Sequence, residues 1–380
     1  MTLADAVSAE PLLLLGEPRA RGLAQARLRP ELVGHVRHAI AHRLEETKSA
    51  LARADVRNFI RAERDFTASH YPEILQEIEG IAAGFGLEPE LLLDYLHCST
   101  AMDLAELEEH RPDGCTALAF TAERGHAVVA KNRDYRAEHI PIQQVMLHRD
   151  PAWDGREIMV LGSLGSPGNF SSGMNSDGLA VADTASRTTD MGPGFHRYFL
   201  LTWLLVHCAT VDEAIAAIRR TTHTGSGLLV MGDATGAVAA VELGHRAIGF
   251  EQHSSGRVGR TNHFVTPHMA PRNLVVPSNA ASRANSARRL PCLRHLLTAS
   301  AEPIDAGAAA AILAYHGEAL PEIPRGEAFC RHGGDQLSTT ISGAIWATGE
   351  RCLYLASGNP CTASWRRYDL TSSTGREAAE

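Results

Sequence analysis

The 380-residue sequence lacks the short motifs of several large enzyme classes. It contains no HExxH metal-binding motif, no GxxxxGK[ST] phosphate-binding loop and no G-x-S-x-G nucleophile elbow. It also has no apolar run that approaches the roughly 20 residues needed to cross a membrane. These absences argue against a zinc protease, a P-loop nucleotide hydrolase, an α/β-hydrolase and a membrane-spanning protein.

The cysteines form no recognisable set. There are seven, an odd number, and no CxxC pair occurs among them, which argues against a disulfide framework and against a zinc site. His35, His38 and His42 fall at helical spacing, but no carboxylate or cysteine completes a ligand set there. We therefore expect no metal and no redox cofactor, and we expect most of the cysteines to be small buried residues.

The charge balance is mildly acidic. There are 36 Lys and Arg residues against 44 Asp and Glu residues, a net charge of −8, which argues against a nucleic-acid partner and against docking on an anionic membrane. The N-terminus has no basic start, and its apolar run, residues 12–15, is far shorter than the core of a signal peptide. These features predict a cytoplasmic protein.

The chain changes character near Gly114. Before it, apolar residues at helical spacing predict helices over residues 30–51, 71–85 and 89–104, the second of them stopped by Gly86. After it, short β-rich runs joined by tight turns predict hairpins, which are interrupted by helices over residues 195–219, 286–299 and 306–316. Segregated hairpins and helices indicate an α+β fold in which helices cover two antiparallel sheets.

Cys115 stands at this change of character, directly after Asp113 and Gly114. A cysteine thiol at such a junction can attack the carbonyl of the preceding residue, and glycine there has no Cβ to hinder the attack. Cleavage would leave Cys115 as a new N-terminus whose α-amine, with a pKa of about 7.7–8, can act as a general base. The alternative is an ordinary buried cysteine at the start of a strand.

Asp134 ends the return strand of the hairpin that begins at Cys115. Since a hairpin brings its two outer ends together, we expect the Asp134 carboxylate to lie near Cys115, where it could orient an α-ammonium group. Its neighbour Arg133 could lower the thiol pKa or bind a substrate carboxylate. The alternative for both is an exposed ion pair in a loop.

Two asparagines are candidates for stabilising an oxyanion. Asn175 lies in a turn between strands, and Asn262 lies in the sequence Thr261-Asn262-His263. The alternative for Asn175 is a turn residue only. His263 also permits a Cys–His pair in a chain that is not cleaved.

These motifs, in this order and spacing, resemble the acyl-coenzyme A:6-aminopenicillanic acid acyltransferase family, relatives of the choloylglycine hydrolases within the Ntn hydrolases. The matching segments are short but are spread over most of the chain: residues 17–22, 71–82, 113–116, 132–135, 173–180 and 261–263. The departure is Arg133, because a hydrophobic or aromatic residue often precedes the aspartate in the family. Arg133 therefore indicates an anionic group on the substrate.

The resemblance implies a four-layer αββα sandwich and a precursor cut between Gly114 and Cys115. Residues 1–114 are then a helical pro-segment or α chain, and residues 115–380 the catalytic β chain. It further implies Cys115 as nucleophile, Asp134 as the residue that orients its amine, and Asn175 and Asn262 as oxyanion donors. An arginine near the start of the helix over residues 286–299 is expected at the site, and among Arg283, Arg288 and Arg289 we favour Arg288.

The predicted function is hydrolysis or transfer of the acyl group of a small amide or thioester, without a cofactor, although coenzyme A could be a leaving group. Two alternatives stay open. One is a choloylglycine-hydrolase-like or N-acyl amino acid amidase without acyl transfer. The other is a non-catalytic binding protein on the same scaffold. A homo-oligomer is also compatible with the sequence.

Overall fold

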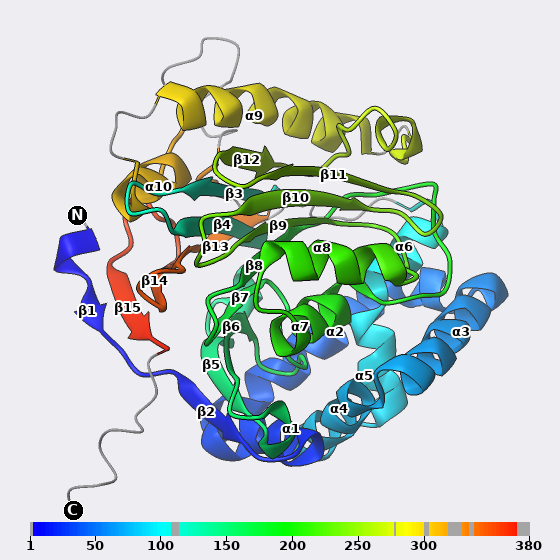
Figure 1. Cartoon of the computed structure of the whole chain (residues 1–380). Coiled ribbons are helices and arrows are strands. Elements are labelled where there is room, and N and C mark those ends of the chain that lie inside the picture. The colour runs from blue at the N-terminus through cyan, green and yellow to red at the C-terminus, as the bar shows by residue number, and fades with distance from the viewer. Residues whose placement is uncertain are drawn as a thin grey trace, which may run out of the picture.

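Two stacked β-sheets form the centre of the molecule (Figure 1). The computed structural model describes residues 3–107, 114–276, 279–299, 304–317, 329–333 and 338–370. Within these residues sheet A has seven strands in the order β1 (Val7–Ser8), β15 (Trp365–Asp369), β14 (Cys352–Ser357), β13 (Thr339–Ala347), β4 (Ala127–Tyr135), β3 (Thr116–Thr121) and β12 (Arg257–Arg260). Sheet B has eight, in the order β11 (Ile248–His253), β10 (Val238–Leu243), β9 (Leu228–Gly232), β8 (Ala180–Thr184), β7 (Ser172–Asn175), β6 (Glu157–Ser163), β5 (Gln143–Arg149) and β2 (Leu12–Leu15).

Helices cover the outer face of each sheet. On sheet A lie α9 (Ala280–Ala299) and α10 (Ala306–Leu313). On the side of sheet B lie α1 (Pro18–Leu28), α2 (Val33–Leu51), α4 (Pro72–Phe85), α5 (Pro89–Leu96), α7 (Arg197–His207) and α8 (Val211–Arg220). Two more helices, α3 (Ala54–His70) and α6 (Cys98–Leu104), pack against this group through a smaller apolar cluster.

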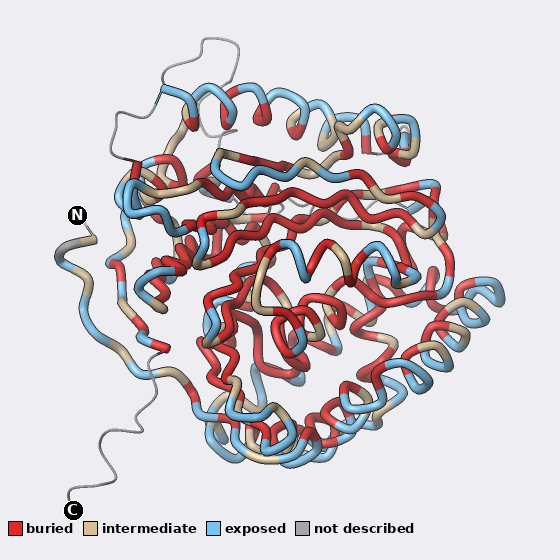
Figure 2. Tube along the Cα trace, in the orientation of Figure 1, coloured by how far each residue is buried: buried red, intermediate tan, exposed pale blue. Residues whose placement is uncertain are grey.

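Three buried apolar clusters hold the two sheets and the two groups of covering helices together. Between the sheets, Val129 and Trp346 of sheet A meet Met159 of sheet B in one buried cluster. A second cluster joins sheet A to α9 and α10, and a third joins sheet B to the helices on its side. Figure 2 shows the same division, since the strands are mostly buried and the helices alternate between buried and exposed residues. The αββα sandwich expected from the sequence is confirmed.

The predicted hairpins are present. The strand pairs β3–β4, β9–β10 and β13–β14 are antiparallel neighbours, as their short turns indicate. The predicted helix over residues 71–85 is α4, and Gly86 ends it in a left-handed conformation with φ of 63°. The helix expected over residues 89–104 is broken at His97 into α5 and α6, because His97 has a non-helical backbone and its Nδ1 contacts the Leu93 carbonyl oxygen.

The N-terminal segment is not entirely helical, which corrects the expectation for residues 1–114. Strand β1 pairs with β15 in sheet A and β2 pairs with β5 in sheet B, both in parallel, while the other strand pairs are antiparallel. In β2 the leucines alternate, with Leu12 and Leu14 buried and Leu13 and Leu15 exposed. This alternation is the pattern of an edge strand with one buried face.

The helices α1 and α4, which carry two of the family-like segments, touch along their backbones. A Cβ atom on Gly22 would lie 2.7 Å from the Ile81 nitrogen, and one on Gly80 would lie 2.9 Å from the Arg19 carbonyl carbon. Real side chains never come so close to backbone, so both positions require glycine. The two segments therefore form one closely packed helix pair.

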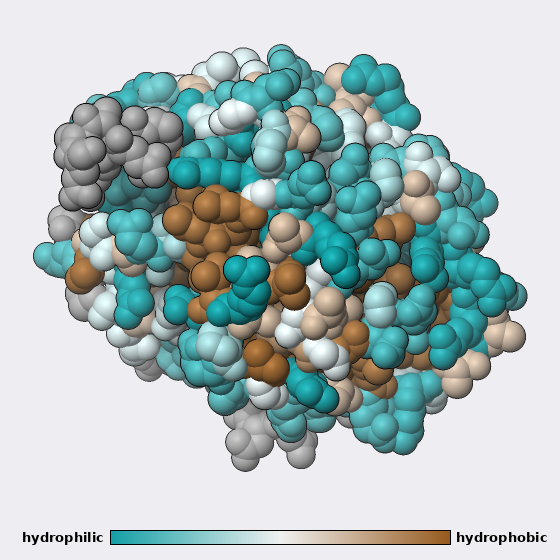
Figure 3. Space-filling view, turned by 90° about the horizontal axis from the view of Figure 1, so that it is seen from below, coloured by the Kyte–Doolittle hydropathy of each residue, from teal (hydrophilic) through white to brown (hydrophobic). Residues whose placement is uncertain are grey.

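The face of the molecule shown in Figure 3 is largely hydrophilic, with one larger hydrophobic area and several smaller ones. Among the residues that the structure describes, none of the helices combines the length and apolar character needed to cross a membrane. The cytoplasmic location stays a prediction.

Candidate active site

Cys115 lies immediately before β3, next to the end of β4. The register that pairs Thr116 with Asn132 brings its thiol to Asp134. The Cys115 Sγ lies 3.4 Å from the Asp134 backbone nitrogen, which donates to it, and 3.6 Å from the Asp134 carbonyl oxygen. The expectation that the hairpin places these two residues side by side is confirmed.

The Asp134 carboxylate is fully buried. Its Oδ1 accepts a hydrogen bond of 2.6 Å from the Thr340 hydroxyl, and its Oδ2 has no hydrogen-bond partner among the described residues. The Arg331 Nε lies 4.0 Å from Oδ2. Burial raises the pKa of Asp134 above its ordinary value, although Arg331 and Thr340 act in the opposite direction.

Gly114 lies directly against this carboxylate. A Cβ atom added to Gly114 would lie 2.6 Å from Asp134 Oδ2 and would also collide with the Arg331 guanidinium. A larger residue here would have to displace one of these two side chains. The Asp134 Oδ2 atom therefore lies next to the Gly114–Cys115 peptide bond.

Arg289 connects the nucleophile segment to Asn262. Its Nη1 donates to the Cys115 carbonyl oxygen at 2.9 Å and to the Thr116 hydroxyl at 2.8 Å. Its Nη2 donates to Asn262 Oδ1 at 2.7 Å, and its Nε donates to Asn285 Oδ1 at 2.8 Å. Burial lowers the pKa of Arg289 to about 10, an effect that Asp134 opposes. The guanidinium thus holds two predicted site residues in a fixed relation.

This contact corrects the choice of Arg288. Helix α9 turns its Ser286, Arg289 and Leu293 side chains inward, at helical spacing, whereas Arg288 is exposed on the outer face. Neighbouring residues on a helix point about 100° apart, so only one of the two arginines can face sheet A. The remaining candidate, Arg283, lines a neighbouring pocket that also includes Asn262.

Asn262 lies where a site residue is expected. Its backbone nitrogen donates to the Ser286 hydroxyl at 2.7 Å, and its Nδ2 donates to the Ala185 carbonyl oxygen at 3.0 Å. With Arg289 on its Oδ1, the side chain is held at two points and the backbone at a third. The side-chain amide carries a second hydrogen besides the one that Ala185 accepts.

Asn175 is not brought to this site, which corrects the expectation that it is an oxyanion donor. Its Nδ2 donates both hydrogens to helix carbonyl oxygens, that of Leu205 at 2.8 Å and that of Cys208 at 2.7 Å. Its Oδ1 accepts from the Leu179 backbone nitrogen. The amide therefore has no donor left, and it joins the turn after β7 to α7.

His263 does not pair with Cys115. Its Nδ1 lies 2.7 Å from the Ser286 hydroxyl and 3.3 Å from the Thr261 hydroxyl. Burial and the nearby Arg283 lower its pKa to about 4, so it is neutral at physiological pH. Through these contacts His263 links α9 to the loop after β12.

A pocket opens beside Cys115. It encloses about 670 Å³, including solvent at its mouth, and its walls include Cys115, Asp134 and Arg133. The N-terminal segment supplies Tyr95 and Ser99 to the same walls. Residues on both sides of the predicted cut thus line one pocket.

Arg133 reaches into this pocket from β4. Its Nη1 donates to Gln143 Oε1 and its Nη2 to the Ser163 hydroxyl, both at 3.1 Å, and its guanidinium lies 5.4 Å from the Tyr135 ring centre. Within the described part of the chain it has no carboxylate partner. A positive charge with neutral neighbours is suited to an anionic ligand.

Sequence reasoning missed a buried ion network in the same pocket. Lys131 of sheet A and Arg197 of α7 both pair with Asp183 of sheet B, and all three side chains are almost completely buried. The network joins the two sheets beside Cys115. The only sequence signal for this network was the position of Lys131, which lies two residues before Arg133 and therefore on the same face of β4.

Arg289 allows a direct test of the site's construction. We expect Arg289→Ala to lower the free energy of unfolding by about 2–4 kcal/mol, because it leaves several buried acceptors without a donor. Arg288→Ala, the matched control on the adjacent exposed position, should change it by less than about 0.5 kcal/mol. Urea denaturation of both variants measures the difference, and equal effects would contradict the assignment.

Comparisons with known proteins were made with the whole chain. The sequence profile of the acyl-coenzyme A:6-aminopenicillanic acid acyl-transferase family matches residues 121–361, more than half of the chain. A search of curated protein sequences found no match.

Several solved structures share part of the architecture. A Caenorhabditis elegans N-acylethanolamine-hydrolyzing acid amidase has 13% identity and a TM-score of 0.43, over 62% of this chain and 93% of the other. A conjugated bile acid hydrolase variant from Clostridium perfringens has 12% identity and a TM-score of 0.41, over 67% and 97%. Penicillin V acylase from Agrobacterium tumefaciens has 13% identity and a TM-score of 0.39, over 68% and 87%. Similarity this low carries no information about substrate.

The family match begins six residues after Cys115 and extends through the strands and helices that build the site. The four-layer sandwich and the position of Cys115 at the start of β3 agree with the sequence-based expectation. The chain belongs to the acyl-coenzyme A:6-aminopenicillanic acid acyl-transferase family of Ntn hydrolases.

Proposed function

We propose that this protein is a self-processing cysteine hydrolase or acyltransferase that cleaves or transfers the acyl group of a small N-acyl amide through a thioester on Cys115. The observation that carries the proposal is the Asp134 Oδ2 atom, which is buried against Gly114 and accepts no hydrogen bond among the described residues, with only the Arg331 guanidinium nearby. A buried carboxylate oxygen that accepts no hydrogen bond is costly. It gains a hydrogen-bond donor when cleavage turns the Cys115 nitrogen into an ammonium group.

Self-cleavage proceeds in two steps. The Cys115 thiol attacks the Gly114 carbonyl carbon, the bond from this carbon to the Cys115 nitrogen breaks, and the nitrogen takes up a proton. Water then hydrolyses the resulting thioester, which frees the Gly114 carboxylate and the Cys115 thiol. The tight space around Gly114 favours this reaction, because it restricts the scissile peptide to few conformations next to the thiol.

After cleavage, residues 1–114 and 115–380 would remain together. Strand β1 is hydrogen-bonded to β15 and strand β2 to β5, so the N-terminal chain is part of both sheets. It also supplies part of the pocket wall. The α chain is therefore a permanent component of the enzyme in this proposal.

Catalysis on a substrate follows the same chemistry. The Cys115 thiol passes its proton to the freed α-amine and attacks the amide carbonyl, and Asn262 donates to the oxyanion. The ammonium returns the proton to the leaving amine while the carbon–nitrogen bond breaks. Water or a second amine then attacks the thioester. Asp134 Oδ2 accepts a hydrogen bond from the ammonium and keeps it oriented.

The pocket supports an amide that carries a negative charge. Arg133 has only neutral hydrogen-bond partners among the described residues, so a carboxylate on the substrate would give it an anionic partner. This observation favours the second candidate, an amidase for N-acyl amino acids, because such substrates carry a carboxylate.

Covalent trapping tests the proposal. The purified protein is incubated with a panel of N-acyl amino acids, bile-salt conjugates and N-acylated 6-aminopenicillanic acids, and its intact mass is measured at short times. We expect the chain that begins at Cys115 to gain the mass of the acyl group, and added amine to divert the acyl group if transfer competes with hydrolysis. Binding without acylation or amine release from any of these substrates would instead favour a non-catalytic binding protein.

A further inference from the structure

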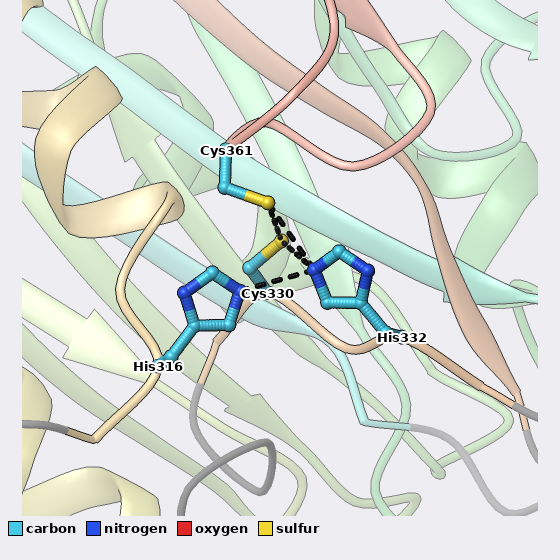
Figure 4. A group of neighbouring side chains, drawn as sticks. All are labelled: His316, Cys330, His332 and Cys361. Carbon is cyan, nitrogen blue, oxygen red and sulfur yellow. Dashed lines mark hydrogen bonds between the residues drawn. The ribbon is translucent and has the colours of Figure 1, made fainter.

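Two histidines and two cysteines converge on the outer side of sheet A, outside the lining of the pocket beside Cys115. They are His316, Cys330, His332 and Cys361, and one potential ligand atom from each lies within 4.8 Å of all the others. Figure 4 shows the four side chains pointing toward a common centre. They come from three separate parts of the chain: the segment after α10, the segment before β13, and the loop between β14 and β15.

The distances between these atoms agree with one tetrahedral ion. The two sulfurs lie 3.5 Å apart, and the two Nε2 atoms lie 3.1 Å apart. The Nε2 of His332 lies 3.7 Å from Cys330 Sγ and 3.2 Å from Cys361 Sγ. Tetrahedral zinc is bonded at about 2.3 Å to sulfur and about 2.05 Å to nitrogen. It would separate two sulfurs by about 3.8 Å, two nitrogens by about 3.3 Å, and a nitrogen from a sulfur by about 3.6 Å.

We propose that His316, Cys330, His332 and Cys361 bind one Zn²⁺ ion in a structural site. Two thiolates and two imidazoles in tetrahedral arrangement are a donor set typical of zinc. Four protein ligands leave no open position for a substrate or a water molecule, so the ion would hold structure rather than perform catalysis. The earlier expectation of no metal depended on the absence of a CxxC pair, which excludes only ligands that are close in sequence.

A disulfide is the other reaction available to these cysteines, and the geometry argues against it. The sulfur–sulfur distance of 3.5 Å is far longer than the roughly 2.05 Å of a disulfide bond. The two histidines also have no role in a disulfide, yet the His332 Nε2 contacts both sulfurs and the His316 Nε2 contacts the His332 Nε2. Asn359 supports the metal reading, since its Nδ2 lies 3.6 Å from Cys330 Sγ and can donate to a thiolate.

The position of this cluster gives the ion a connection to the processing site. Arg331 lies between the ligands Cys330 and His332, and its guanidinium lies against Gly114 and Asp134. Asn359 also donates to the Arg331 carbonyl oxygen at 2.7 Å. An ion bound to both neighbours of Arg331 would fix the Arg331 backbone. It would thereby also fix the position of the Arg331 guanidinium beside the Asp134 carboxylate.

Metal analysis of the full chain tests the site without any substrate. The purified protein is treated with a reductant, equilibrated with Zn²⁺, passed over a chelating resin and analysed by elemental mass spectrometry. We expect one zinc per chain, and near-complete loss in a Cys330→Ser, Cys361→Ser double variant. Cys208→Ala is the matched control, because Cys208 is a buried cysteine outside the cluster and its variant should keep the zinc.

Cobalt provides a second measurement on the wild type, in case the double variant does not fold. Substitution by Co²⁺ should produce the intense visible bands of tetrahedral cobalt together with sulfur-to-cobalt charge-transfer bands. A wild type without zinc and without these bands would overturn the proposal, as would zinc that the folded double variant retains. An intact mass lower by two hydrogens after purification without reductant, with no zinc bound, would show a disulfide instead. Since neither measurement depends on Cys115, failure here would leave the proposed enzymatic function untouched.

Discussion

Replacement of Cys115 by alanine is expected to keep the chain as a single species of 40.9 kDa, whereas the wild type separates into two. In proportion to their 114 and 266 residues, the wild-type fragments should have masses of roughly 12 and 29 kDa. In the proposed mechanism the thiol attacks the Gly114 carbonyl, so its removal should abolish cleavage. Intact-protein mass spectrometry under denaturing conditions makes the comparison.

The same variant should lose amide hydrolysis by about 10⁴-fold or more, because it lacks both the nucleophile and the freed amine. Cys208→Ala serves as the control for losing a buried cysteine, and it should be cleaved like the wild type. A wild type that stays uncut at 40.9 kDa would remove the α-amine as base. An uncut wild type that still hydrolyses amides would restore a histidine-dependent mechanism as the leading hypothesis.

Asp134→Asn should lower the amidase rate by about 10²–10⁴-fold while making the uncleaved chain more stable. Asparagine retains the size of the side chain and can still accept from Thr340, but it carries no charge to orient the ammonium. The rate is measured as initial amide hydrolysis. Stability is measured as thermal unfolding of Asp134→Asn in the Cys115→Ala background, where no cleavage intervenes.

The gain in stability follows from the pKa of Asp134, which burial raises above its ordinary value. A carboxyl group with a raised pKa binds its proton more tightly in the folded state. Its stabilising contribution is complete below the unfolded pKa of about 3.9 and is lost as the pH rises through the folded pKa. The gap in melting temperature between Asp134→Asn and its parent should therefore be small near pH 4 and widen toward neutral pH.

Asp233 offers a matched control with the opposite expectation. It is also buried, but its carboxylate accepts from the backbone nitrogens of Val211 and Thr235. Asp233→Asn should therefore lower stability and leave the amidase rate of the folded enzyme nearly unchanged. If Asp134→Asn behaved in the same way, Asp134 would be a structural residue and the proposed mechanism would lose its orienting group.

Local patterns in the sequence were sufficient to place Cys115 beside Asp134. A two-stranded hairpin with a short turn has one register that keeps its apolar face buried, and that register puts Cys115 beside Asp134. The same reasoning located the hairpins β9–β10 and β13–β14 and the end of α4 at Gly86. Each of these predictions depends on residues less than about 25 positions apart.

The residues that were predicted wrongly depend instead on contacts between distant parts of the chain. Whether Arg288 or Arg289 faces the site depends on the rotation of α9 over sheet A, which residues far away in the chain decide. The prediction for Asn175 depended on its turn and on the family resemblance, but α7 packs against that turn and occupies its amide. The strands β1 and β2 were missed because an edge strand of two to four residues has too few side chains to show a period.

The sequence by itself therefore determined the fold class, the family-like order of motifs and the pairing of Cys115 with Asp134, because short turns and periodic apolar residues act over short stretches of chain. Only the tertiary structure decided the pocket, the Arg289–Asn262 contact, the buried Lys131–Asp183–Arg197 network and the His316–Cys361 cluster. In each of these, side chains from distant segments meet across two sheets or between a sheet and a helix. Their meeting is a property of how whole layers pack, and no local pattern in the sequence encodes it.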